Sequence, residues 1–446
     1  MPPMLSPILI GRDAELRTLV SSLDAAATGT GGAFFLTGDP GVGKSRLAAE
    51  LSSVAEARGF ATYRGRAVQS ASPVPFRPFT EALMQLGRSG SLAKAASASE
   101  YRSVLATLVP ELGQPGRTNT EVNPLTVAEA LLRVLALTDM GSILILEDLH
   151  WADPETLATV DYLADNLSER RILLIATLRD DEPSAGLDIA RSVIARRSAE
   201  LIPVPRLTEL EVEQMAGACL DADREAAAAV TKLLTQCDGL PFAVEEILAA
   251  AVTSGELEHR SDGWHLHDGV TTRMPDSIVG SVQNRLASLK PRVAEVIVAA
   301  AVLGRQFDWT LLPSMCEADD SEVISALAQA RAVQLIEPHS EGHGWLRFRH
   351  SLTRAAILSG LLPPDLVRRS AAAAEAVETA HPGLPGTWCD LAAGLYGAAG
   401  YHADSARLLL EAGHRALVHG AVSSASETLT EARAQLGQVS DADPTL

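Results

Sequence analysis

Near its amino end the chain reads Gly38-Asp39-Pro40-Gly41-Val42-Gly43-Lys44-Ser45, which fits the phosphate-binding loop pattern G-x-x-x-x-G-K-[ST]. In such a loop, glycines let backbone N–H groups close around the β-phosphate, Lys44 adds a point charge, and the Ser45 hydroxyl can ligate Mg²⁺. The apolar run Ala33–Thr37 precedes the loop, and a helical pattern over Ser45–Arg58 follows it. Because strand, loop and helix come in the order that the motif requires, and because the chain has only four lysines, the stretch predicts a nucleotide site.

A second motif, later in the chain, supplies acidic groups. The run Ser142–Leu146 is continuously apolar and ends in Glu147 and Asp148. This pattern is typical of a strand that is buried on both faces, with its carboxylates at the edge where open α/β sheets bind ligands. Such acids can hold Mg²⁺ and orient the attacking water. We therefore expect this strand in the same parallel sheet as the phosphate loop, with Ser45, Glu147 and Asp148 as the metal ligands.

A further buried strand is predicted over Arg171–Leu178, and Arg179 follows it. An arginine at the end of such a strand can reach a γ-phosphate. The alternative from local sequence alone is that Arg179 pairs on the surface with the acids that come next.

The remaining apolar patterns complete an α/β domain that ends near Pro205. Asp153 and Pro154 have the residue types of an N-cap and a first helical position. We expect strands also at Ala61–Arg64 and Leu201–Val204, and helices at Asp13–Ala27, Phe79–Leu86, Tyr101–Leu108 and Leu125–Leu137, the last three on one face of the sheet.

Beyond Pro205 the pattern is almost wholly helical. We predict helices at Thr208–Cys219, Asp223–Gln236, Phe242–Thr253, Ser277–Leu289, Pro291–Leu303, Ser321–Ala330, Leu391–Ala399, Ala403–Gly413 and Ala421–Leu436, and hairpins at Glu256–His267 and Val333–Arg349. Helices followed by a two-stranded wing suggest a winged-helix fold. The expected architecture is an α/β P-loop NTPase domain over 1–205, an α-helical lid over 206–272, a winged-helix domain over 273–362, and the start of TPR-like helical repeats over 363–446.

Composition limits the classes of partner. The net charge is −19 and the pI about 5.0, so the chain as a whole has no broad electrostatic attraction to nucleic acid or to an anionic membrane. The four cysteines, Cys219, Cys237, Cys316 and Cys389, lack C-x-x-C spacing, which argues against a zinc site or a disulfide framework. Neither a signal peptide nor a membrane helix is expected, and the cytoplasm is the expected location.

Together these residues resemble the STAND class of signal-transducing P-loop ATPases, and most closely the amino-terminal half of the large ATP-binding LuxR-type regulators. Ile10-Gly11-Arg12 with Glu15 is similar to the motif that opens the family's nucleotide domain. Residues 38–45 match its Walker A loop, and Leu146-Glu147-Asp148-Leu149-His150-Trp151-Ala152-Asp153 is similar to its Walker B segment. Other STAND members have two aspartates where this chain has Glu147-Asp148, so which acid holds the metal stays open.

The resemblance implies roles for further residues. Arg179 matches the family's sensor arginine, and Gly239-Leu240-Pro241 is similar to a G-x-P motif whose proline packs beside the adenine. Phe348-Arg349-His350, with Arg354 one turn beyond, resembles a winged-helix signature whose histidine touches the β-phosphate of ADP. The catalytic residues implied are Glu147, Asp148 and Arg179. The nucleotide-binding residues implied are Gly11, Arg12, Gly38, Asp39, Pro40, Gly41, Val42, Gly43, Lys44, Ser45, Arg46, Pro241 and His350.

The expected function is an ATP/ADP-binding signal-transduction switch with Mg²⁺ as cofactor and slow ATPase activity, the regulatory core of a transcriptional regulator. Self-association is expected in the ATP state, and an inducer or protein partner outside the chain is implied. Any DNA contact would come from a carboxyl-terminal domain that this chain lacks. The alternatives are a conventional AAA-like motor or loader, a scaffold that holds nucleotide as a structural ligand, and a regulatory module linked to a cyclase.

Overall fold

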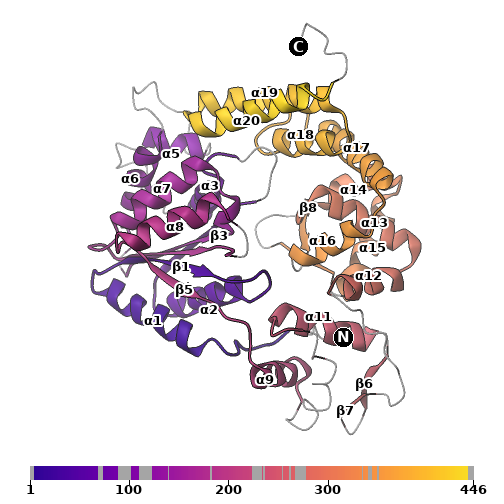
Figure 1. Ribbon diagram of the computed structural model, residues 1–446, viewed down its shortest axis with the longest axis horizontal. Helices are drawn as coiled ribbons and strands as arrows, with labels where there is room; N and C mark the ends of the chain where they lie inside the picture. The colour runs from indigo at the N-terminus through magenta and orange to yellow at the C-terminus, as the bar shows by residue number, and fades with distance from the viewer. Residues whose placement is uncertain are drawn as a thin grey trace. The chain divides into compact units, whose positions relative to one another are not determined.

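A computed structural model gives the fold of most of the chain (Figure 1). The described residues are 5–68, 74–88, 102–109, 123–138, 140–180, 183–222, 234, 237–253, 255–260, 263–266, 278–333, 335–339, 344–348 and 351–439. They form two compact units. The sheet unit consists of Arg12–Asp39, Lys44–Pro205 and Ala406–Leu446, and the helical unit consists of Met1–Gly11, Pro40–Gly43 and Arg206–Ser405.

A five-stranded parallel sheet lies at the centre of the sheet unit, with its strands in the order β2-β3-β4-β1-β5. The strands are β1 (Gly32–Thr37), β2 (Ala61–Arg66), β3 (Ser142–Glu147), β4 (Ile172–Thr177) and β5 (Glu200–Pro203). All five lie within two residues of their predicted bounds. The prediction that the phosphate-loop strand and the acidic strand share one parallel sheet is therefore confirmed, with β4 between them.

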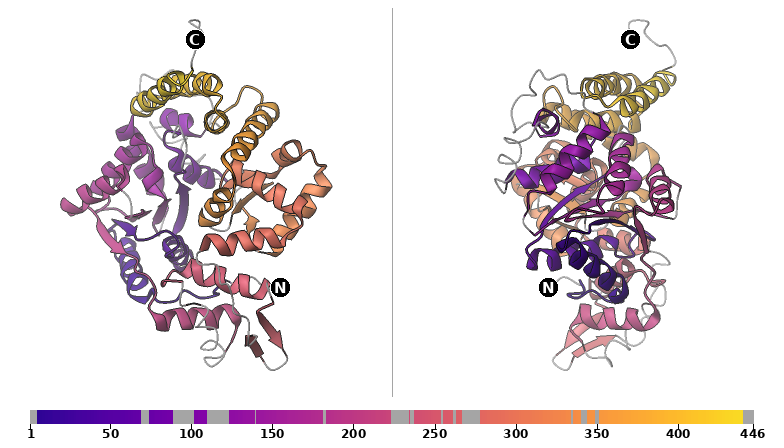
Figure 2. Two further views of the ribbon diagram at one scale, coloured as in Figure 1. Left: turned by 45° about the vertical axis from the view of Figure 1, so that its right-hand side comes forward. Right: turned by 90° about the vertical axis from the view of Figure 1, so that its left-hand side faces the viewer.

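Helices cover both faces of this sheet (Figures 1 and 2). One face carries α3 (Arg77–Arg88), α5 (Arg102–Leu108), α6 (Pro124–Leu135), α7 (Pro154–Asp165) and α8 (Ala185–Ala195), and the other carries α1 (Asp13–Ala27) and α2 (Lys44–Ala57). The three helices predicted to share one face do so. Helix α8 was not expected from the sequence.

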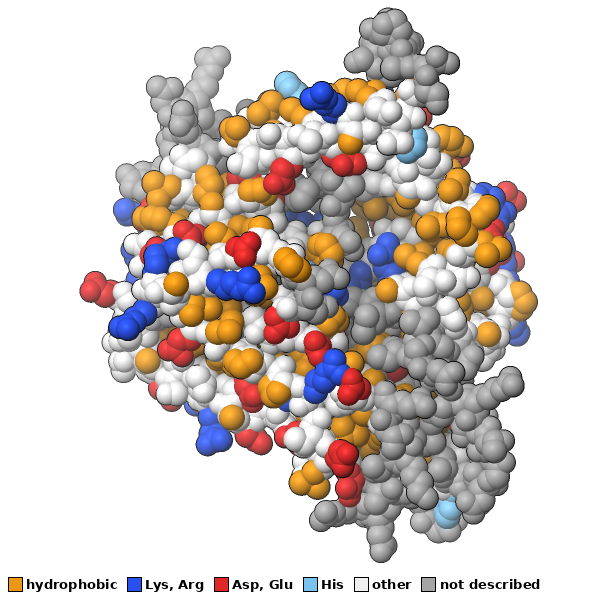
Figure 3. Space-filling view, viewed as in Figure 1, with side chains coloured by type: hydrophobic (Ala, Val, Ile, Leu, Met, Phe, Trp, Pro, Cys, Tyr) orange, Lys and Arg blue, Asp and Glu red, His pale blue; other side chains and the backbone are white. Residues whose placement is uncertain are grey.

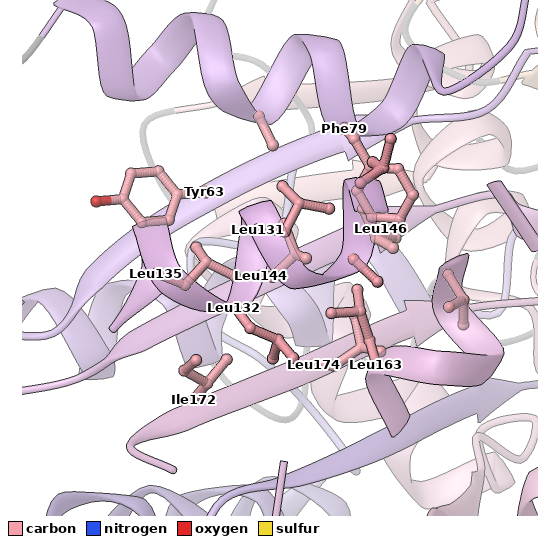
Figure 4. Packing of buried hydrophobic residues seen from close by; sticks show 14 of the residues in the cluster. Tyr63, Phe79, Leu131, Leu132, Leu135, Leu144, Leu146, Leu163, Ile172 and Leu174 are labelled. Atoms are coloured by element: carbon pink, nitrogen blue, oxygen red, sulfur yellow. The ribbon is translucent and has the colours of Figure 1, made fainter. Parts of the chain in front are cut away.

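The core of the sheet unit follows from the alternation of strand side chains. Leu144 and Leu146 of β3 and Leu174 of β4 point to one face, where they meet Leu131 of α6 and Leu163 of α7 (Figure 4). Intervening residues point to the opposite face. Every residue of β3 and β4 is buried, which is why both strands are near-continuous apolar runs in the sequence.

The helical unit contains short helices and two small antiparallel sheets. Its helices are α9 (Glu209–Leu220), α11 (Pro241–Thr253), α12 (Ile278–Ser288), α13 (Pro291–Leu303), α14 (Leu312–Cys316), α15 (Asp320–Ala332), α16 (Ser351–Ser359), α17 (Pro363–Ala380) and α18 (Trp388–Ala398). Its strands are β6 (Leu257–Arg260) and β7 (Gly263–Leu266), which pair, and β8 (Gln306–Asp308), β9 (Ile336–Pro338) and β10 (Trp345–Phe348), in the order β8-β10-β9.

The two predicted hairpins correspond to β6–β7 and β9–β10. The second has an unpredicted third strand, because β8 pairs with β10 on the side away from β9. Only three residues long and only partly buried at either end, β8 gives too short an apolar pattern to be recognised. The predicted helix at Asp223–Gln236 falls almost wholly outside the described residues.

A buried ion pair joins two helices inside the helical unit. The guanidinium group of Arg285 on α12 pairs with the carboxylate of Glu246 on α11, and both side chains are almost completely buried. Arg285 also donates to the carbonyl oxygen of Val333 at 3.3 Å. Removing one partner would leave a buried charge, so the pair fixes α12 against α11.

The last two helices are α19 (His402–Val418) and α20 (Val422–Leu436), close to the predicted 403–413 and 421–436. Ser405 and Ala406 of α19 belong to different units, so the chain returns to the sheet unit along this helix. Among the described residues, none of the helices has both the length and the apolar composition needed to span a membrane. Acidic and basic side chains are interspersed on the described surface in Figure 3.

Candidate functional site

The phosphate loop connects β1 to α2 at the carboxyl edge of the sheet. The Nζ atom of Lys44 donates to the carbonyl oxygens of Gly38 and Asp39, at 2.5 and 3.0 Å, and the side chain is buried. Because α2 begins at Lys44, the loop lies at the N-terminus of this helix, where the helix dipole favours anions. Gly41 has a φ of +79°, and an added Cβ would lie 3.0 Å from the Cβ of Phe242, so both conformation and space favour glycine there.

The acidic strand ends beside this loop. The Ser45 hydroxyl donates to Oε2 of Glu147 at 3.3 Å, across 102 positions of sequence. Asp148 follows with a left-handed backbone, φ +59°, and its N–H donates to Oγ1 of Thr177 at 2.9 Å. The structure therefore places Ser45 against Glu147, while the side chain of Asp148 is linked to Glu147 through Arg66, which pairs with both carboxylates. Thr177 of β4 fixes the turn.

Two arginines on β2, which the sequence analysis missed, face these acids. Nη2 of Arg64 lies 2.6 Å from Oε1 of Glu147, and Arg66 pairs with Oε2 of the same carboxylate. Nε of Arg66 also lies 3.4 Å from Oδ2 of Asp148. Arg66 is directly opposite Glu147 in the β2–β3 register. The signal was present as two arginines two positions apart, Arg64 at the end of the predicted strand and Arg66 two residues beyond it, a spacing that places both on one face of a strand.

The ion pairs control the protonation of Glu147. Burial alone would raise the pKa of this carboxyl group, but the charges and hydrogen bonds of Arg66 and Arg64 outweigh it and hold the pKa at about 2. Glu147 is therefore ionised, and its charge is balanced by guanidinium groups. A carboxylate in this state accepts a proton poorly.

The pKa of Asp153 is shifted in the opposite direction. Its burial raises the pKa to about 6, although the side chain accepts hydrogen bonds from the N–H groups of Thr156 at 2.8 Å and Phe76 at 3.3 Å. The bond from Thr156 confirms the predicted N-cap of α7. The bond from Phe76 ties the segment before α3 to the turn that follows Glu147 and Asp148.

The site fits Mg²⁺ better than a metal held by protein ligands alone. Among the described residues there is no group of three or more His, Cys, Asp or Glu side chains placed to hold a metal. Mg²⁺ is typically bound by one or two carboxylates together with substrate phosphates. A hydroxyl and a carboxylate at 3.3 Å, at the edge of a phosphate loop, are donors of that kind.

The opening motif is divided between the two units, because Gly11 belongs to the helical unit and Arg12 to the sheet unit. Nη2 of Arg12, a buried side chain, donates to the carbonyl oxygen of Pro205 at 2.6 Å. In the helical unit, Gly11 has a φ of +65°, and an added Cβ would meet Glu211 and Leu207.

The remaining predicted residues are placed less closely. Arg179 lies two residues beyond β4, at the same sheet edge as the loop, and is half-buried. Arg46 is exposed in the first turn of α2. Pro241 begins α11, and the next residue, Phe242, donates its N–H to the carbonyl oxygen of Gly41 at 3.3 Å. His350 lies outside the described residues.

Comparison with known proteins identifies the class of the first domain. Residues 8–175 match the AAA ATPase domain family. This region contains the phosphate loop, the arginines of β2 and the acidic strand end, so this part of the chain is an AAA-type P-loop ATPase domain with a five-stranded parallel sheet.

A relative extends the comparison to nearly the whole chain. An uncharacterized protein of Rhizobium meliloti (strain 1021) is 25% identical over 469 residues, covering 98% of this chain and 43% of the relative. The chain thus spans less than half the length of this curated relative.

Solved structures with a similar fold are more distant. Cdc6p of Pyrobaculum aerophilum matches at 15% identity, 80% of this chain, 96% of that chain and a TM-score of 0.40. The ORC2 protein of Aeropyrum pernix in ADPNP–ADP complexes matches at 14% identity over 80% of this chain and 95% of that chain, with a TM-score of 0.37. The RuvB Holliday junction branch migration motor of Thermotoga maritima matches at 12% identity over 79% of this chain and 96% of that chain, with a TM-score of 0.33.

The pKa of Glu147 predicts an acid-dependent stability. Its value in the folded state, about 2, is below the ordinary 4.5, so the ionised group stabilises the fold above pH 4.5, and this contribution, about 3 kcal/mol, is lost as the pH falls toward 2. The Glu147→Gln variant should therefore unfold at lower urea than the wild type at pH 7, with a smaller difference at pH 3.

The matched control for this comparison is Glu200→Gln, which replaces an exposed carboxylate on β5. Its urea midpoint should follow that of the wild type at every pH. Parallel curves for the wild type and Glu147→Gln from pH 7 to pH 3 would show that the ion pairs do not hold the pKa of Glu147 low.

Proposed function

We propose that this chain is an ATP/ADP-binding switch with slow ATPase activity, the regulatory core of a transcriptional regulator that resembles the STAND-class LuxR-type proteins. The observation that carries the proposal is the joint placement of Lys44 and the Ser45–Glu147 pair at the edge of the parallel sheet. A phosphate-binding cation and a metal-ligand pair at one edge suit a nucleoside triphosphate with Mg²⁺.

The protein groups would divide the work between phosphate and metal. Lys44 exchanges its bonds to the Gly38 and Asp39 carbonyl oxygens for contacts with phosphate oxygens, while the N–H groups at the start of α2 bind the same anion. Ser45 and Glu147 would hold Mg²⁺, and the bound ion would neutralise charge on the phosphates. Asp148 is proposed to orient the attacking water, and Arg179 is proposed to contact the γ-phosphate.

Slow hydrolysis follows from the arginines on β2. Glu147 is the acid proposed to hold Mg²⁺, so its carboxylate oxygens must be available to the metal. Arg64 and Arg66 also hold both oxygens of the carboxylate. Glu147 must exchange these partners before it serves a metal or a water, which suits a switch that keeps its nucleotide.

The helical unit supplies the second half of the proposed switch. Its helices α9 and α11 are proposed to form the lid, and α12–α16 with β8–β10 the winged helix. Helices α17–α20, which run along the chain from the helical unit into the sheet unit, are proposed to be the start of TPR-like repeats. ADP bound by both the phosphate loop and His350 would keep the protein closed, and ATP would favour an open, self-associating form. Reversing a 1:99 population requires the nucleotide to prefer one form by about 5.5 kcal/mol.

A conventional AAA-type ATPase, a motor or loader in which turnover itself does the work, is the second candidate. The match of residues 8–175 to the AAA ATPase domain family favours it. The switch is preferred because the acid at the end of β3 is engaged by two arginines. An inducer, and DNA contacts through a further domain of a longer protein, belong to the regulator proposal.

Replacing the phosphate-loop lysine tests the nucleotide site. Lys44→Ala should reduce ATP and ADP affinity by at least about a hundredfold in calorimetric titrations, because a charge-assisted contact to phosphate is lost. The control is Lys290→Ala, an exposed lysine that precedes α13. Wild-type affinity in the Lys44→Ala variant would contradict the site.

Replacing His350 tests the two-nucleotide switch. His350→Ala should speed ADP release at least about fivefold and leave ATP affinity nearly unchanged, because the proposed contact is made only to the β-phosphate of ADP in the closed form. The readout is stopped-flow release of a fluorescent ADP analogue, and the control is His414→Ala, an exposed histidine on α19. Unchanged ADP release would remove His350 from the switch.

A further inference from the structure

Glu155, in the first turn of α7, binds the N-terminus of α20, a helix near the carboxyl end of the chain. The Oε1 atom of Glu155 accepts hydrogen bonds from the N–H groups of Ser423 at 2.8 Å and Ser424 at 3.0 Å, and Oε2 accepts from the Ser424 hydroxyl. Glu155 is 4% exposed and Ser424 fully buried. Helices α7 and α20 therefore pack together within the sheet unit (Figures 1 and 2).

The carboxylate of Glu155 takes the place of an N-cap side chain for α20. The N-cap position of α20 is Ala421, which makes no side-chain hydrogen bond to the helix and is among the poorest N-cap residues. An N-cap side chain normally accepts from the second or third N–H group of its helix. Ser423 and Ser424 occupy those positions, so Glu155 supplies from α7 what the sequence before α20 does not.

The charge of Glu155 suits this role. A carboxylate is favoured at the N-terminus of a helix, and it makes stronger hydrogen bonds to N–H and O–H groups than a neutral acceptor does. Glu427, one turn further along α20, opposes it: burial and the negative charge of Glu155 raise the pKa of Glu427. The contact therefore contains one attractive and one repulsive component, which separate substitutions can change in opposite directions.

The position of α7 connects this contact to the nucleotide site. Glu147 and Asp148 end β3, a single 3-10 turn (Leu149–Trp151) follows, and Asp153 caps α7 just before Glu155. This segment is held at both ends: Asp148 donates its N–H to Thr177, and Asp153 accepts a hydrogen bond from the N–H of Phe76. A shift of the acidic turn on metal binding would displace the first turn of α7 and with it the partner of α20.

We propose that Glu155 is a docking residue that holds the C-terminal helices α19 and α20 on α7, and that the nucleotide state acts on these helices through this contact. The second part rests on the proposed function. Since α19 continues directly from the helical unit, opening the contact would free the segment that links the two units along the chain.

Hydrogen exchange of the whole 446-residue chain without nucleotide tests the docking itself. The N–H groups of Ser423 and Ser424 are the donors to Glu155, so peptides covering 419–432 report the contact directly. Glu155→Ala should speed their exchange about fivefold to tenfold, and Ser424→Ala should speed it less, because the backbone donors remain. Glu427→Gln should slow it about twofold, because a like charge is removed.

Asp161→Ala is the control, since it removes a carboxylate of α7 that pairs with Arg196 on the surface. Peptides from α1 show whether a variant has lost its fold. If Glu155→Ala unfolds the protein, the slower exchange expected in Glu427→Gln still decides the case. Unchanged exchange of 419–432 in both variants would overturn the docking proposal.

Hydrogen exchange with added nucleotide separates the docking of α20 on Glu155 from its coupling to the nucleotide state. Saturating Mg²⁺–ATP should speed exchange of 419–432 in the wild type at least about threefold, and should have no effect in Lys44→Ala. If calorimetry shows ATP bound to the wild type and exchange of 419–432 does not change, the coupling is wrong while nucleotide binding stands. If ATP does not bind at all, the proposed function fails and the nucleotide-free comparison still decides the docking.

Discussion

The ion-paired carboxylate of Glu147 is the interaction on which the organisation of the sheet unit depends. It brings together the start of α2 through Ser45 and the end of β2 through Arg64 and Arg66. A buried carboxylate would be costly without these partners, and the arginines compensate its charge. Because the parallel register of β2 and β3 sets Arg66 opposite Glu147, the sheet determines the electrostatics of the site.

The same strand end also organises the helices that follow it. Asp148 has a left-handed backbone held by Thr177, and Asp153 begins α7 while binding the segment before α3. Two residues later, Glu155 binds the first turn of α20. The end of β3 and the short segment after it thus carry, in order, the acids proposed to bind a metal, a helix cap and the proposed docking residue. Its order suggests how an event at the phosphate loop could reach the C-terminal helices.

Much of the fold could be predicted because local patterns determine it. The strands of the sheet are apolar runs bounded by polar residues, and their predicted bounds differ from the structure by at most two residues. Ser45, Glu147 and Asp148 were predicted to meet because the carboxyl ends of parallel strands share one edge. The AAA-type domain over residues 8–175 agrees with the predicted P-loop class.

Interactions between distant parts of the chain could not be predicted. Arg64 and Arg66 gain meaning only from the β2–β3 register, and Glu155 is 268 positions from Ser423. β8 was missed because its partner β10 is distant and its own pattern too short. The STAND and LuxR assignments, the winged helix, the TPR-like repeats and the roles of Arg179, Pro241 and His350 remain predictions.

Steady-state ATP turnover at saturating Mg²⁺ tests the central claim, that ion-paired Glu147 makes this ATPase domain a slow switch. We predict a wild-type rate of about one per minute or less, faster turnover in Arg64→Gln, and no change in Arg58→Gln, which breaks a surface pair with Asp24. A wild-type rate of several per second, on the order of typical enzymes, would contradict it.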